Sequence, residues 1–162
     1  MDALTLLRDQ AAMAERLAGQ ILAELTDAQA RWRLEGSTAN PIAPTILHVY
    51  ENEDRVVQGA QDRAPLWDGA WPERAGAAPR AVWAGADPDL ARVLAYAAAV
   101  RAATAGFLAA LEPAALEREV DTPRGKRPLA APLSLVLVVH KFVHLGEVAA
   151  LLGCQGAKGF PV

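Results

Sequence analysis

The sequence predicts an all-α protein that forms a single domain over residues 1–162. The chain contains 36 Ala and 21 Leu, and both residue types are strong helix formers. Four long segments also carry apolar residues three and four positions apart, the spacing that lays one apolar stripe along a helix. We therefore expect a four-helix bundle with a long Pro- and Trp-rich connection between its second and third helices.

The first part of the chain predicts two long helices with a short one between them. Residues 2–25 form the first, because apolar residues recur at helical spacing at Leu4, Leu7, Ala11, Ala14, Leu17, Ile21 and Leu25. A short helical piece is expected over residues 28–33. The second long helix begins at Asn40-Pro41, since Asn caps a helix and Pro suits its first turn, and it ends near residue 60.

Residues 61–89 form the long connection. Prolines and glycines interrupt any regular period there, and the segment holds Trp67, Trp71 and Trp83. Long loops are uncommon in compact domains and are often functional. We expect an ordered cover that packs on the helices through its aromatic side chains.

The remaining residues predict two further helices. Asp87-Pro88 pairs a cap with a first-turn proline, so a third helix is expected from there to about Leu111. The charged residues 117–127 are expected to form an exposed connection. Residues 131–152 allow two interpretations: Leu133–Val139 is rich in β-branched residues and suits a buried strand, whereas the length of the segment favours a helix buried nearly all round.

Charge and composition exclude several classes of protein. The formal net charge is −3, which argues against a nucleic-acid partner because phosphate binding needs a concentrated basic surface. No uninterrupted apolar run reaches the ~20 residues that span a bilayer, and charges are spread through residues 1–20 where a signal peptide would be apolar. We expect a cytoplasmic protein with no membrane partner. The single cysteine, Cys154, excludes an intrachain disulfide and is expected to be inert.

The three histidines of the chain are the main candidates for chemistry. His140 and His144 are four residues apart, so on a helix their Cβ atoms would lie ~5–6 Å apart and both imidazoles could bind one metal ion. On a strand they would be ~13 Å apart and could not share an ion. His48, midway along the second predicted helix, is the natural third ligand. Three neutral imidazoles leave coordination positions open, as in a catalytic zinc site.

Two carboxylates accompany these histidines. Glu147 shares a helix face with His140 and His144, and Glu51 follows His48 on the same face of its helix. Either carboxylate could orient a ligating histidine, bind the metal or act as a base on a metal-bound water, or it could be a solvated acid. The histidines could likewise be satisfied core or surface residues without a metal. The sequence assigns no other catalytic or cofactor-binding residue.

The order of motifs along the chain resembles that of a known family. The C-terminal motif is His140-Lys-Phe-Val-His144-Leu-Gly146-Glu147, followed by further glycines. Before it come, in this order, Leu25-Thr-Asp, Trp32, Asn40-Pro-Ile and Leu47-His48. Together these motifs resemble the DinB superfamily of DinB/YfiT-like metalloenzymes over almost the whole chain.

This resemblance implies a four-helix bundle, often dimeric, with a divalent metal ion held by three histidines, by position His48, His140 and His144. Imidazole ligands leave zinc, nickel and iron open. Relatives with known activity use low-molecular-weight thiols such as mycothiol or bacillithiol. We therefore expect a thiol S-transferase-like enzyme that activates a small thiol or water for a small-molecule substrate, and a homodimer. The alternative is a non-catalytic stress-response dimer that holds metal or a ligand.

Overall fold

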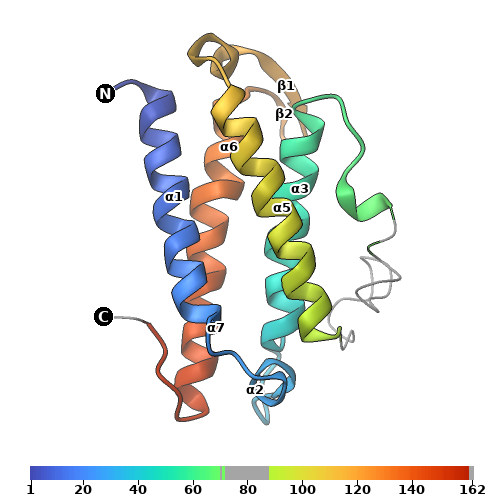
Figure 1. Ribbon diagram of the computed structural model, residues 1–162, viewed down its shortest axis with the longest axis vertical. Helices are drawn as coiled ribbons and strands as arrows, with labels where there is room; N and C mark the ends of the chain where they lie inside the picture. Colours follow the sequence, from blue (N-terminus) through green and yellow to red (C-terminus); the bar gives the residue numbers. More distant parts are fainter. Residues whose placement is uncertain (70, 72–87, 161–162) are drawn as a thin grey trace.

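Four long helices pack side by side in the computed structural model, which describes residues 1–69, 71 and 88–160 (Figure 1). They are α1 (Ala3–Leu22), α3 (Ile42–Gly59), α5 (Leu90–Ala110) and a rod that joins α6 (Ala130–Ser134), the π-helical turn η4 (Leu135–Val139) and α7 (His140–Cys154). The predicted all-α class and four-helix bundle are confirmed, and the bounds of the four helices agree with the sequence to within a few residues.

Local capping explains where the first two helices begin. Asp2 caps α1, because its Oδ1 accepts a hydrogen bond from the Thr5 amide at 2.8 Å. A capping box between Thr26 and Gln29 starts the short helix α2 (Asp27–Arg31). Most of the apolar stripe predicted for α1 is buried, namely Leu4, Leu7, Ala11, Ala14 and Ile21, whereas Leu17 is half-buried beside the buried Ala18, and Leu25 lies beyond the end of the helix.

The core of the described residues lies between the helices in two large clusters and a small one formed by Ala30, Ala43 and Leu90. The cluster toward α2 holds, among others, Ile46, Tyr96 and Val148. The cluster toward the opposite end of the bundle holds residues such as Leu7 and Leu133. Each long helix contributes to this core, so the bundle supplies a rigid support for side chains on α3 and α7.

The start of the long connection packs down on α3 and α5, as predicted. A short 3₁₀ helix, η1 (Leu66–Asp68), places Trp67 in the core with its ring 5.2 Å from that of Tyr96. The buried carboxylate of Asp54 on α3 accepts hydrogen bonds from the amides of Leu66 and Trp67 at 3.1 and 2.9 Å and from the Tyr96 hydroxyl at 2.8 Å. The prediction for the rest of the connection, with Trp83, falls outside the described residues.

The expected charged connection is exposed but is not irregular. Strands β1 (Glu119–Thr122) and β2 (Gly125–Pro128) form an antiparallel hairpin that follows the 3₁₀ helix η3 (Pro113–Glu117). The turn is closed by Thr122, whose Oγ1 donates to the Gly125 carbonyl oxygen at 2.6 Å, and Gly125 adopts a φ of +89°. Alternation of Val120 and Thr122 with charged residues was the strand signal, and it is too short to stand out from a charged loop.

Residues 130–154 form a helix, and the strand interpretation is wrong. The β-branched stretch that suggested a strand is η4, a π-helical turn in which the His140 amide donates to the Leu135 carbonyl oxygen, five residues back. Such turns occur mostly as single wide turns inside α-helices, frequently beside functional sites. The two histidines four residues apart therefore share a helix.

Two helices, α5 and the rod of residues 130–154, are long and apolar enough to cross a membrane by length and composition. The criterion of uninterrupted runs missed them because single polar residues divide their apolar stretches. Both supply core residues of the bundle, such as Val93 and Leu145, and 28% and 44% of their most apolar windows are buried. The cytoplasmic location stays a prediction.

Candidate metal centre

Three histidines meet where α3 and α7 pack against each other. His48 comes from α3, His140 and His144 come from α7, and all three are half-buried. The nearest ring nitrogens of the three side chains all lie within 4.8 Å of one another. His140 Nε2 is 3.1 Å from His48 Nε2 and 3.1 Å from His144 Nε2. The structure thus brings together the three residues that the sequence singled out.

Two of the three separations between these nitrogens fit a single metal ion. Metal–nitrogen bonds of about 2.0–2.1 Å, at right or tetrahedral angles, separate neighbouring ligand nitrogens by about 2.9–3.4 Å. Both 3.1 Å separations fall in this range. The rings stand edge to face, with interplanar angles of 64°, 88° and 80°, so they converge through their edges. The cluster could therefore hold a metal ion and leave positions open for other ligands.

The surroundings keep His140 uncharged at neutral pH. Burial, together with the nearby His144 and His48, lowers the pKa of His140 to about 4. The usual value is about 6.5. An uncharged imidazole has the free lone pair that a metal ion needs. Its Nδ1 is buried and has no hydrogen-bond partner among the described residues, so Nε2 is the nitrogen that faces the other histidines.

Glu147 orients His144. The Nδ1 of His144 lies 2.6 Å from Oε2 of Glu147, and because a carboxylate only accepts, the ring donates its Nδ1 proton. The lone pair of His144 is then on Nε2, the nitrogen that points toward His140. A carboxylate that fixes the tautomer of a ligating histidine in this way is typical of metal sites.

Asn52 contacts His48 and was missed in the sequence. Its Nδ2 lies 3.1 Å from Nδ1 of His48 and donates to the His48 carbonyl oxygen at 2.8 Å. Asn52 is four residues after His48, a spacing that places both side chains on one face of the helix. The search of the sequence for partners of the histidines considered carboxylates and did not consider amides. A metal ion on Nε2 of His48 requires the proton on Nδ1, and the Asn52 amide would then turn its oxygen toward that nitrogen.

Glu51 has a charged partner on its own helix. It is fully buried, and its carboxylate pairs with Nε of Arg55 one turn along α3. Nη2 of Arg55 also lies 3.4 Å from Oδ1 of Asp68 on η1. The helix spacing offered Glu51 both His48 and Arg55 as neighbours, and the charged arginine is the stronger partner for a buried carboxylate. A role of Glu51 at the metal stays a prediction.

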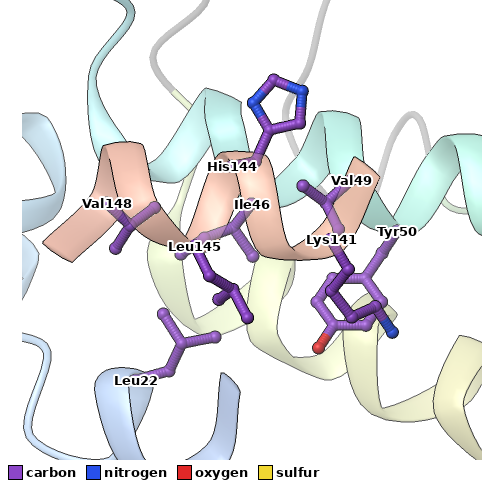
Figure 2. Close-up of a pocket in the computed structure, with 8 residues that line it drawn as sticks. All are labelled: Leu22, Ile46, Val49, Tyr50, Lys141, His144, Leu145 and Val148. Carbon is purple, nitrogen blue, oxygen red and sulfur yellow. The ribbon is translucent and has the colours of Figure 1, made fainter. Parts of the chain in front are cut away.

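Among the described residues, the cavity that borders the site on its core side is too small for a substrate. A cavity of about 10 Å³ lies between α1, α3 and α7, and its lining residues include Leu22, Ile46 and Leu145; His144 also borders it, but its ring points away (Figure 2). A single water needs about 10–15 Å³. A substrate would have to approach the histidines from another side, and a pocket formed with the Trp-rich connection stays a prediction because most of that segment is outside the described residues.

Comparisons with known proteins agree with this fold. A family model described as the DinB superfamily matches residues 10–148. A solved structure described as the conserved protein of a locus from Enterococcus faecalis is similar with a TM-score of 0.72 and 18% sequence identity, over 94% of this chain and 99% of that chain. At this identity the likeness shows the fold alone. The curated proteins searched contain no match.

In metal-free protein, His140 should make stability fall as the pH is lowered from 7 to 5. Its pKa is about 4 in the folded chain, below the usual unfolded value of about 6.5, so only the unfolded chain takes up this proton between the two values. The contribution of His140 to the free energy of unfolding therefore rises with pH across that window.

Thermal unfolding in EDTA should show a smaller drop in melting temperature for His140→Gln than for the wild type when the pH is lowered from 7 to 5. Burial raises the pKa of Glu53, which acts in the opposite direction but is common to both proteins. An equal drop in the two proteins would contradict the assignment.

The partner of His48 should tune metal affinity. Asn52→Asp supplies a carboxylate oxygen for the Nδ1 proton of His48, whereas Asn52→Leu supplies no acceptor. We expect the Asp variant to bind Zn²⁺ more tightly than the Leu variant by about 10–100-fold, the usual effect of such supporting residues. Competition with a chromophoric chelator measures both constants. Equal affinities would show that Asn52 does not act on the site.

Proposed function

We propose, from the premise that this chain belongs to the DinB superfamily, that it is a metal-dependent enzyme whose His48, His140 and His144 hold a divalent ion. The observation that carries the proposal is the convergence of three imidazoles from two helices, with neighbouring Nε2 atoms 3.1 Å apart. Zinc, nickel and iron all suit such ligands.

The favoured reaction is transfer of a small thiol to an electrophilic small molecule, with hydrolysis second. A bound divalent ion lowers the pKa of a thiol or water ligand toward neutrality. The chain's own part is to hold the ion with three uncharged ligands and to orient His144 through Glu147. The Glu147 side chain is 55% exposed, so its carboxylate can also accept a proton at the open side of the site.

The thiol is proposed to come from a low-molecular-weight compound. Cys154 is the only thiol of the chain, and it is exposed at the end of α7. At the rise of an α-helix it lies ~15 Å beyond His144, too far to reach an ion bound there. A thiol that meets the metal must therefore be a separate molecule.

A non-catalytic, stress-response bundle that binds metal or a ligand is the second candidate. The observation behind it is the small size, about 10 Å³, of the cavity that borders His144 among the described residues. In this case the same histidines bind the ion without turnover. A homodimer is proposed for both candidates on the family resemblance alone.

The histidines should account for the metal content of the protein. Wild-type protein loaded with Zn²⁺ and freed of excess metal should retain a stoichiometric amount, and His140→Ala should retain little, because two nitrogens bind far more weakly than three. Elemental analysis of both proteins measures this. Equal metal in the two proteins, or none in the wild type after loading with zinc, nickel and iron in turn, would contradict the site.

Turnover should depend on the metal. Thiol consumption with a panel of electrophiles should stop after treatment with a chelator and return when metal is restored. Glu147→Gln should keep its metal but react about 10²-fold more slowly, the lower range for loss of a positioned acid–base group. If no electrophile or ester is turned over in a metal-dependent way, the non-catalytic candidate is correct and the enzyme is not.

A further inference from the structure

Adjacent faces of α7 carry the histidines and a buried lysine. Lys141 follows His140 directly and is only 1% exposed, whereas His140 and His144 are half-buried. Figure 2 shows Lys141 and Leu145 on one side of α7 and His144 on the other. The rotation of α7 about its own axis therefore decides which of these side chains enters the core.

Lys141 is tied to carboxylates on two other helices. Its Nζ pairs with Oε2 of Glu53 on α3 at 2.6 Å and with Glu15 on α1, and it lies 4.9 Å from the centre of the Tyr50 ring. Oε1 of Glu53 accepts a hydrogen bond from Thr104 on α5 at 2.7 Å. A single polar network thus joins all four long helices at the level of the histidines.

This network is a poor source of net stability. Lys141 and Glu53 are 1% and 0% exposed, and the cost of removing two charges from water offsets most of their attraction. Breaking such a pair is nevertheless strongly unfavourable, because one buried charge would lose its partner. The network therefore disfavours any packing of α7 in which Lys141 does not reach Glu53.

The rod contains two competing registers for its buried face. Before and within η4 the buried residues are Leu129, Leu133, Val136 and Leu137. Continued at spacings of three and four, this stripe would next bury His140 and His144. In the structure it resumes one residue later, at Lys141 and Leu145, because the π-helical turn takes up one extra residue.

We propose that Lys141 is a positioning residue for the three-histidine site. Its ion pairs with Glu53 and Glu15 hold α7 in the rotation that points His140 and His144 at His48. A slip of one residue turns an α-helix by ~100°, enough to carry the imidazoles toward the core and to expose the lysine. The expected loss of metal affinity rests on the proposed function. The expected movement of the imidazole rings does not.

The test is the double variant Lys141→Met with Glu53→Gln, which removes both buried charges and keeps their approximate size. We expect it to fold, as judged by circular dichroism, but to bind Zn²⁺ about 10–100-fold more weakly. In the metal-free protein, nuclear Overhauser contacts between the rings of His48 and His140, whose centres are 4.9 Å apart, should be lost.

The matched control is Leu116→Ala, which removes a side chain 2% exposed in the other core cluster. It should lower the melting temperature and leave zinc affinity and ring contacts unchanged. A loss of zinc affinity as large as that of the double variant would show a general effect of instability and overturn the proposal.

A folded double variant with wild-type zinc affinity and ring contacts also overturns the proposal. If the double variant does not fold, Glu15→Gln removes only the partly exposed pair, and it should weaken zinc binding several-fold. Unchanged affinity in that variant would contradict the positioning role. A wild-type protein that binds no zinc contradicts the proposed function instead, and the ring contacts still decide the position of α7.

Discussion

The approach of three imidazole nitrogens to one point is the interaction on which the interpretation of this molecule depends. An uncharged imidazole has one N–H group and one lone pair, so a ring nitrogen can donate or accept but not both. His140 Nε2 has two such neighbours at 3.1 Å and no other partner for its ring nitrogens among the described residues. A cation satisfies all three lone pairs together, which hydrogen bonds among the rings do not.

The bundle supports this arrangement from two sides. On α3, His48 faces α7. The next turn buries Tyr50, Glu53 and Asp54, and the Asp54 carboxylate binds the backbone of η1. On α7, Lys141 follows His140 directly and its side chain reaches inward to Glu53. The site is thus built on rigid helices whose mutual orientation is specified by buried polar contacts, which suits a geometry that tolerates errors of only a few tenths of an ångström.

The periodicity of apolar residues predicts the four helices, and the spacing of His140 and His144 predicts two members of the candidate site. Both are local signals, and the addition of His48 needed only a bundle to bring two helices together. Long-range contacts decided the rest. Lys141 lies in an apolar segment, but a lysine is almost never fully buried without partners, and its partners are carboxylates from two other helices that no local pattern reveals. The π-helical turn likewise follows from a conflict between an upstream apolar stripe and a downstream buried lysine, and no local pattern specifies how that conflict is resolved.

X-ray absorption spectroscopy of protein loaded with one equivalent of zinc tests the central claim most directly, since it reports the ligands of the ion itself. The account predicts scattering from three imidazoles with zinc–nitrogen distances of about 2.0–2.1 Å and a remaining position filled by a water oxygen. A shell made of oxygen alone, or one with fewer than two imidazoles, would contradict it.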